Sequence, residues 1–186
     1  TTSFPTDDPW VTSTGGTTLD RTQNGFAETA WNNSLGASGG GFSAFFSTPS
    51  YQQSLPGAVQ QLLNKRRGVP DVAADADPNT GLAIYVNGWT MAGGTSASAP
   101  FWAAITAIAN QVAGQPLGFL NVGLYKLGAS STYARDFRDI TSGNNTRVVN
   151  GIIVPGHNAV AGWDPVTGLG SPDAENLIPD LIAALQ

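Results

Sequence analysis

The chain has 186 residues, of which 41% are hydrophobic and 11% are charged. This length and hydrophobic content suffice for one buried core, and the charged fraction is too low for a disordered tail. Its net charge of −5 and pI of about 4.5 argue against nucleic acid as a partner, since the one basic cluster, Lys65-Arg66-Arg67, is interpreted as a solvated helix end. The absence of cysteine excludes disulfides and thiol chemistry. The longest apolar run, Ala99–Ala109, is shorter than the roughly 20 residues that cross a bilayer, so no membrane partner is expected.

The first half of the chain alternates short apolar segments with turn signals. A strand with a glycine break is predicted over Pro9–Leu19, followed by a small-residue loop over Ser34–Ser43. A short amphipathic helix is predicted over Ala58–Lys65. Two further apolar strands, Val69–Ala74 and Leu82–Val86, are each followed by a turn signal, at Asp77-Pro78-Asn79 and Asn87-Gly88.

The second half begins with an apolar helix predicted from Ser98 to Val112 and a second helix over Leu120–Leu127. From there to Gly170 the chain is predicted to be mostly loop. A last helix is expected after Ser171, with Pro172 at its first position and a kink or restart at Pro179. Strands that alternate with helices in this way predict a single-domain α/β fold with a parallel sheet.

The most informative segment for function is Met91–Pro100, a glycine-rich turn that carries a serine to the start of the apolar helix. Gly93 and Gly94 permit close backbone approach and positive φ, and Pro100 is expected in the first helical turn. A serine at a helix N-terminus lies beside backbone N–H groups that can stabilise an oxyanion, so Ser96 is a candidate nucleophile. The alternative is that Thr95 or Ser96 only caps the helix.

Gly-Thr-Ser-Ala-Ser-Ala-Pro at 94–100 resembles the nucleophile motif of the subtilisin-like clan. The preceding glycine and the continuation Phe-Trp-Ala-Ala at 101–104 resemble the sedolisin family of serine-carboxyl peptidases in particular. Three other segments resemble the same family, in its order: 4–17, with Phe-Pro and Gly-Gly-Thr; 67–81, which begins Arg-Gly-Val-Pro-Asp; and 139–172, with Trp-Asp-Pro-Val-Thr-Gly. The resemblance implies a subtilisin-like α/β fold with a parallel sheet flanked by helices, of which residues 1–186 form the C-terminal half.

The resemblance also implies peptide-bond hydrolysis at acid pH through an acyl-enzyme on Ser96. In that family a glutamate serves as the base, an aspartate stands behind it, and a second aspartate lies at the oxyanion site; all three belong to the N-terminal half of the domain. Glu28 and Glu175 are the only glutamates in this chain, and neither lies in a matching motif. A separate N-terminal chain is therefore the expected partner, because the sequence starts at Thr1 and is interpreted as processed or cut from something longer.

Substrate and metal sites follow from the same resemblance. Ser38, Gly39 and Gly40 on one side of the cleft, with Gly93, Gly94 and Thr95 on the other, are expected to bind a peptide or protein substrate by main-chain hydrogen bonds; a plain flexible loop is the alternative for the first group. The family pattern places Ca²⁺ on the side chains of Asp139 and Asp164 and on three backbone carbonyls, those of Ile140, Val160 and Gly162. The alternative is that both aspartates only cap turns.

Two other functions remain open at this point. The chain could be a calcium-stabilised fragment or pseudo-peptidase that binds peptides without cleaving them. It could also be an esterase in which His157, the one histidine, serves as the base of Ser96, with a neutral to alkaline pH optimum. The resemblance favours a secreted protein with a prodomain, in the extracellular space or an acidic compartment.

Overall fold

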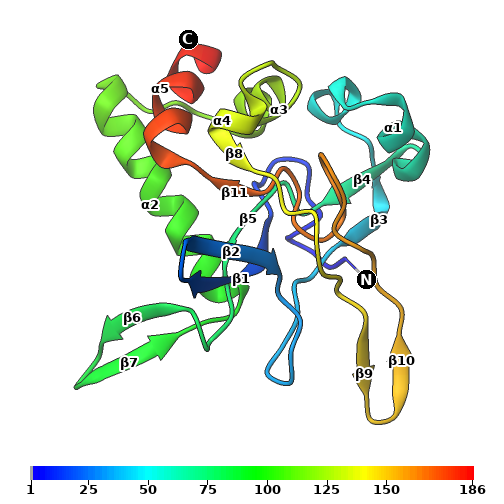
Figure 1. Cartoon of the computed structure of the whole chain (residues 1–186). Coiled ribbons are helices and arrows are strands. Elements are labelled where there is room, and N and C mark those ends of the chain that lie inside the picture. The colour runs from blue at the N-terminus through cyan, green and yellow to red at the C-terminus, as the bar shows by residue number, and fades with distance from the viewer. Residues whose placement is uncertain (1) are drawn as a thin grey trace.

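The computed structural model describes residues 2–186, and its helices gather at one end of the molecule while two β-hairpins project from the other (Figure 1). The strands are β1 (Thr14–Thr22), β2 (Gly25–Ala30), β3 (Gly41–Ser47), β4 (Arg66–Val69), β5 (Val72–Asp75), β6 (Leu82–Tyr85), β7 (Trp89–Ala92), β8 (Phe137–Arg138), β9 (Arg147–Val149), β10 (Ile152–Val154) and β11 (Ser171–Pro172). The helices are the 3₁₀-helix η1 (Ser50–Ser54), α1 (Gly57–Leu63), α2 (Thr95–Ala113), α3 (Asn121–Gly128), α4 (Tyr133–Asp136) and α5 (Ala174–Leu185).

The central sheet has the order β2-β1-β5, and its parallel part is the pairing of β1 with β5, in register from Thr14↔Val72 to Thr17↔Asp75. Helix α2 packs against both of these strands, and α5 packs against α2 and α3. The main core lies between these elements and is formed by large buried side chains, among them Leu63, Trp102, Leu124, Phe137, Trp163, Leu169, Leu177 and Leu181. The α/β prediction is therefore confirmed, with two of the parallel strands present in the described part of the chain.

The first strand begins at Thr14 rather than at Pro9, because residues 9–10 form a turn and residue 11 a bend. The glycines are no break, since Gly15 and Gly16 lie inside β1. Close packing explains them: a Cβ at Gly15 would lie 2.7 Å from the Val166 carbonyl oxygen, and one at Gly16 would lie 2.6 Å from Ala76 Cβ.

The predicted strand over residues 69–74 is in fact two strands, β4 and β5, separated by Pro70, which has no N–H to donate to a ladder. The interpretation of Lys65-Arg66-Arg67 as a solvated helix end is wrong, because α1 ends at Leu63 and Arg66 begins β4. Lys65 and Arg66 are exposed as predicted, but Arg67 is not. Arg67 lies on β4 and is fully buried, with its guanidinium bonded to Asp71. Local sequence does not indicate this ion pair, because the partner carboxylate lies past Pro70, outside any helix.

The predicted strand over residues 82–86 exists as β6, but it pairs only with β7 and lies outside the central sheet. The two strands form a projecting hairpin whose tip carries an edge-to-face contact between Tyr85 and Trp89, with the Trp89 side chain 77% exposed. A second hairpin, β9–β10, was not predicted; it lies in the long segment that was expected to be mostly loop.

The helix predictions hold apart from their ends. Helix α1 ends at Leu63 rather than residue 65, and α3 lies within one residue of its predicted bounds. Pro172 belongs to β11, not to the last helix, whose N-cap is Asp173 accepting a hydrogen bond from the Asn176 N–H. Pro179 lies inside α5, which continues past it to Leu185. Within residues 2–186, no helix is both long and apolar enough to span a bilayer.

Candidate active site

Ser96 lies in the first turn of α2, directly after the turn that leads out of β7. Gly94 adopts φ +78°, ψ 165°, a conformation open to glycine, and a Cβ on Gly93 would lie 2.6 Å from the Pro78 Cα. Helix α2 begins at Thr95, three residues before the predicted start. Its N-cap is Gly94, without a side-chain capping bond, so the interpretation of Thr95 or Ser96 as an N-cap is wrong.

The Ser96 side chain is available for chemistry. It is exposed, and its hydroxyl makes no hydrogen bond to any group in residues 2–186. Pro100 is the sixth residue of α2 rather than part of the first turn, and because it lacks an N–H it leaves the Ser96 carbonyl without its helical donor. The N–H groups of the first helical turn point toward the same end, and that of Ala97 donates to the Gly94 carbonyl oxygen at 2.8 Å.

Two hydrogen bonds fix α2, and with it Ser96, on the central sheet. The Ser98 hydroxyl, fully buried, donates to the Gly15 carbonyl oxygen on β1 at 2.8 Å. One helical turn later, Trp102 Nε1 donates to the Ala73 carbonyl oxygen on β5 at 2.9 Å. These two buried hydrogen bonds favour a single position of α2 on the sheet, because a buried donor or acceptor left without a partner costs free energy.

Ser96 opens onto a cavity of about 380 Å³. The lining residues are Pro5, Thr6, Val11, Thr12, Ser13, Thr14, Thr95, Ser96 and Ala99. None of them carries a charge or an imidazole, so this part of the chain supplies the serine with no general base.

His157 lines a different cavity, of about 210 Å³, whose lining shares no residue with that of Ser96. Its ring makes an edge-to-face contact with Phe42, and burial lowers the pKa of the imidazole, with a further contribution from the positive charge of Arg66. No hydrogen bond joins His157 to Ser96 within the described residues. The geometry gives the histidine-based esterase no support.

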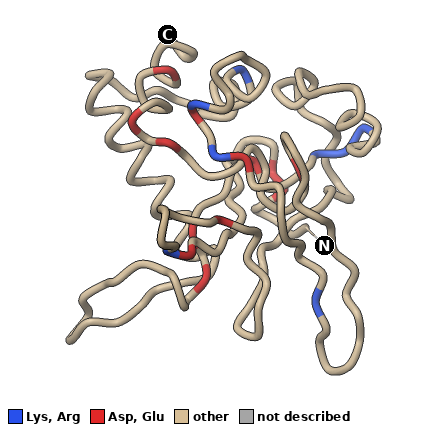
Figure 2. The backbone as a smooth tube through the Cα atoms, viewed as in Figure 1, with Lys and Arg blue, Asp and Glu red and all other residues tan. Residues whose placement is uncertain are grey.

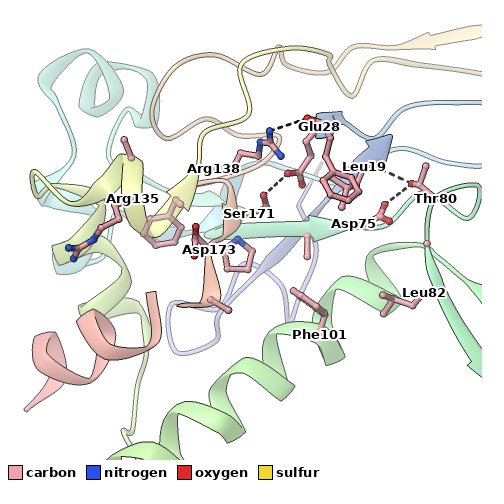
Figure 3. A pocket seen from close by; sticks show the side chains of 17 residues that line it. Leu19, Glu28, Asp75, Thr80, Leu82, Phe101, Arg135, Arg138, Ser171 and Asp173 are labelled. Atoms are coloured by element: carbon pink, nitrogen blue, oxygen red, sulfur yellow. Dashed lines mark hydrogen bonds between the residues drawn. The ribbon is translucent and has the colours of Figure 1, made fainter. Parts of the chain in front are cut away.

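Glu28 also lies apart from Ser96, in another cavity of about 720 Å³ (Figure 3). Its two carboxylate oxygens accept hydrogen bonds from the Thr17 and Ser171 hydroxyls, at 2.6 and 2.7 Å. In the same cavity, burial raises the pKa of Asp75. Glu28 thus ties β1 and β2 to β11 and is not placed to act as a base for Ser96.

The predicted substrate-binding residues fall into two groups. Gly93, Gly94 and Thr95 adjoin Ser96 on the same turn. Ser38, Gly39 and Gly40 line the His157 cavity instead, and the structure does not bring them into the Ser96 cavity.

Two residues of that second group have packing roles in the fold. Ser38 is buried, and its hydroxyl accepts from the Gly16 N–H and donates to the Val166 carbonyl oxygen. Gly40 packs so closely on Pro165 that a Cβ would lie 2.0 Å from its carbonyl oxygen. Gly39 faces open space. Substrate binding by Ser38, Gly39 and Gly40 stays a prediction.

The predicted calcium ligands lie in one loop region. The buried Asp164 carboxylate accepts from the backbone N–H groups of Val160, Val166 and Thr167, and Asp139 accepts from the Gly162 N–H. Burial raises the pKa of Asp164 to about 6.

The two carboxylates also share a neighbour, Tyr133. Burial is the main cause of the raised pKa of Tyr133, and the negative charges of Asp139 and then Asp164 add to it. The Tyr133 hydroxyl donates to the Leu169 carbonyl oxygen at 3.0 Å. Ile140 is buried and Val160 is half-exposed beside them. No cluster of three or more His, Cys, Asp or Glu side chains occurs in residues 2–186, so an ion here would need backbone carbonyls as well. The Asp164 carboxylate is buried and forms no salt bridge within residues 2–186, so its chemistry suits a bound cation.

A buried polar network around Asp71, which contacts Ser13 in the wall of the Ser96 cavity, was not predicted from the sequence. Asp71 receives two guanidinium bonds from Arg67, at 2.7 and 2.6 Å, and a bond from the Tyr125 hydroxyl at 2.8 Å. It also accepts from the Ser13 N–H at 2.8 Å and from Asn121 Nδ2 at 3.3 Å. The signal available in the sequence was an arginine four residues before an aspartate, which is common on surfaces.

No family model matches the chain. Among curated proteins, it is similar to kumamolisin from Bacillus sp. (strain MN-32), at 42% identity over an alignment of 185 residues that covers 96% of this chain and 32% of kumamolisin. It is 36% identical to sedolisin from Pseudomonas sp. (strain 101), over 94% of this chain and 29% of that protein. It is also 36% identical to tripeptidyl-peptidase 1 from Canis lupus familiaris, over 97% of this chain and 33% of that protein.

A solved structure has the same fold. Pseudomonas sedolisin, a serine-carboxyl proteinase complexed with two molecules of pseudo-iodotyrostatin, matches with a TM-score of 0.81 and 35% identity. The match covers 97% of this chain and 48% of that one. The chain therefore spans about a third of the length of the curated relatives and about half of the solved relative.

Proposed function

The chain belongs to the sedolisin family, and from this premise we propose that it is the nucleophile-bearing part of a serine-type peptidase. One observation carries the proposal: the Ser96 hydroxyl is exposed, has no hydrogen-bond partner in residues 2–186 and lines a cavity. The helix that carries it is anchored to the central sheet by Ser98. The relatives' names, which are those of peptidases and of a serine-carboxyl proteinase, support the same reaction class.

In this proposal Ser96 Oγ attacks the carbonyl carbon of a peptide bond while a carboxylate base takes its proton. The tetrahedral oxyanion is stabilised by hydrogen-bond donors, the amine leaves with a proton, and water then hydrolyses the acyl-enzyme. A carboxylate base matches its proton affinity to an acidic medium, so the reaction should run at acid pH. The Ser96 cavity is lined by no carboxylate, and Glu28 is hydrogen-bonded to Thr17 and Ser171 in another cavity. We therefore assign the base, its supporting aspartate and the oxyanion-site aspartate to the N-terminal half of the domain.

The free face of α2 supports a second portion of the enzyme that packs here. The helix has 19 residues and none is charged (Figure 2). Its buried stripe faces β1 and β5, while the opposite face, formed by Ala99, Pro100, Ala103, Ala104, Ala107, Ile108 and Val112, is exposed. An uncharged helix face of this length is costly to leave in water. We assign its covering to the carboxylate-bearing N-terminal half of the domain, supplied as a separate chain.

We propose Ca²⁺ as a structural ion in the loop region of Asp139 and Asp164. The two side chains and the carbonyls of Ile140, Val160 and Gly162 would hold it with hard oxygen ligands. When bound, the ion would neutralise the buried Asp164 carboxylate and restrain the loop; it takes no part in bond cleavage. An extracellular or acidic location agrees with the low charge and the pI of about 4.5.

Fragment complementation tests the proposal. The chain is expressed with the N-terminal half of a sedolisin-type domain, and peptide hydrolysis is measured across acid and neutral pH beside a Ser96→Ala control and a His157→Ala variant. Hydrolysis at acid pH that requires Ser96 and tolerates His157→Ala is the expected result. Binding of peptides without turnover by a folded, assembled complex would refute it and favour the non-catalytic peptide binder. Intact-mass spectra of the native material show whether a second chain accompanies this one.

A further inference from the structure

One wall of the Ser96 cavity is formed by residues 11–13. Asn121, the first residue of α3, makes hydrogen bonds to this wall. It is fully buried; its Oδ1 accepts from the Thr12 hydroxyl at 2.8 Å, and its Nδ2 donates to the Val11 carbonyl oxygen at 3.0 Å. The same Nδ2 donates to Asp71 Oδ2 at 3.3 Å, and that oxygen accepts from the Ser13 N–H at 2.8 Å. Asn121 and Asp71 together therefore hold three consecutive residues, 11–13.

These three residues all line the cavity onto which Ser96 opens. They precede β1, which begins at Thr14, so the parallel ladder with β5 does not include them. Their remaining backbone hydrogen bonds run from Val11 N–H to the Asp8 carbonyl and from the Asp71 and Val72 N–H groups to the Ser13 carbonyl. Among residues 2–186, the side chain of Asn121 is the only hydrogen-bond partner of Thr12.

The opposite side of the cavity is fixed separately, because the Ser98 hydroxyl anchors the helix that carries Ser96 to Gly15. The gap between Ser96 and residues 11–13 is thus set by two buried anchors, Ser98 on the helix side and Asn121 on the wall side. No charged side chain lines the cavity, so its dimensions follow from where residues 11–13 lie relative to Ser96.

We infer that Asn121 is a positioning residue of the Ser96 cavity, which holds the wall of residues 11–13 at the spacing that selects substrate side chains by size. The inference rests on the proposed peptidase function and adds to it a determinant of specificity. Asn121 touches no substrate; it acts through Val11 and Thr12. A displacement of about 1 Å in a site can lower a rate about 100-fold, so the loss of this tie should be measurable.

The chain offers a matched control on the same helix. Tyr125, one turn after Asn121, is equally buried and donates to the other oxygen of Asp71, but it makes no bond to residues 11–13. Asn121→Leu removes all three contacts of the amide, whereas Tyr125→Phe weakens the same network without touching the cavity wall. Asn121→Ser, which shortens the side chain beyond reach of Val11 and Thr12, serves if the leucine variant does not fold.

The experiment compares these variants in the assembled peptidase, with peptides that carry a large or a small side chain on the acyl side of the cleaved bond. We expect the Asn121 variant to change the ratio of kcat/KM between large and small side chains by at least about tenfold. Tyr125→Phe should leave that ratio unchanged even if it lowers Tm as much as the Asn121 variant does. Equal ratios in the two variants at matched Tm would overturn the inference.

A second readout does not depend on peptidase activity. Amide hydrogen exchange is measured on the 186-residue chain itself, and Asn121→Leu should speed exchange in residues 11–14 more than Tyr125→Phe does. Unchanged exchange there would refute the positioning role. An assembled wild-type complex that fails to hydrolyse peptides would count against the proposed function, while faster exchange in the Asn121 variant would still support the structural tie.

Discussion

Arg67 and Asp71 form a fully buried, two-pronged ion pair, with guanidinium nitrogens 2.7 and 2.6 Å from the two carboxylate oxygens. The pair joins β4, on which Arg67 lies, to the residue directly before β5. Asp71 carries the pair's influence further, since it also accepts from the Ser13 N–H beside the Ser96 cavity. The Asp71 charge raises the pKa of Arg67 above its usual range, although burial opposes this, so the guanidinium stays charged inside the core.

Breaking this ion pair from one side should be strongly destabilising. Arg67→Met leaves a buried carboxylate without its cation, which costs about 3–5 kcal/mol in comparable sites. Urea denaturation with a two-state fit measures the free energy of unfolding. The double variant Arg67→Met/Asp71→Asn removes both charges and should recover part of the loss; a double variant as unstable as the sum of the two single ones would contradict the pairing.

The two serines of the nucleophile turn should separate chemistry from stability. Ser96→Ala should abolish hydrolysis and change the free energy of unfolding by no more than about 0.5 kcal/mol, because the side chain is exposed and unbonded. Ser98→Ala should cost about 1–3 kcal/mol, because it leaves the buried Gly15 carbonyl without this donor. Thermal melts and peptide assays on both variants check the contrast, and equal destabilisation by the two substitutions would argue against it.

Gly94 should tolerate no side chain. At φ +78° and ψ 165° an L-residue is strained by about 1–3 kcal/mol, and the strain falls on the turn that carries Ser96. Gly94→Ala should therefore lower both Tm and activity. Gly88→Ala is the control, since this glycine also has positive φ, at +142°, but lies in the distant tip of the β6–β7 hairpin; it should lower Tm without lowering activity per folded molecule.

His157 should contribute to loss of stability in acid. Burial lowers the pKa of its imidazole below the unfolded value of about 6.5, so the folded state binds this proton less readily than the unfolded state does. The contribution of His157 is then most favourable above pH 6.5 or so and is lost as the pH falls through the folded-state pKa. His157→Gln should flatten the dependence of Tm on pH in this window, and an unchanged slope would show that other groups govern it.

Removal of Ca²⁺ should destabilise the chain if the proposed site is correct. An ion present at 100 times its Kd stabilises a folded protein by about 2.7 kcal/mol, so a chelator should lower Tm and added Ca²⁺ should restore it. Asp139→Asn should remove this response, while Asp20→Asn, a change at an exposed acid on β1, should keep it. A response that survives Asp139→Asn would place the ion elsewhere.

The sequence by itself determined the features that depend on neighbouring residues. The Gly93-Gly94 turn, the serine that follows it and the uncharged helix α2 are consequences of local backbone freedom and side-chain pattern. The motif around Ser96, together with the three other segments that resemble the sedolisin family in the same order, predicted the family. The bounds of α1 and α3 were near their predicted positions for the same reason.

Tertiary structure alone decided which polar groups meet. Arg67 looked like a surface cation and became part of the core because Asp71, past a turn, lies opposite it with five donors around one carboxylate. Asn121 carries no motif, and its role follows from contacts more than 100 residues away along the chain. Such partners are set by packing of distant segments, where an unpaired buried polar group is too costly to persist, and local sequence contains no record of that pairing.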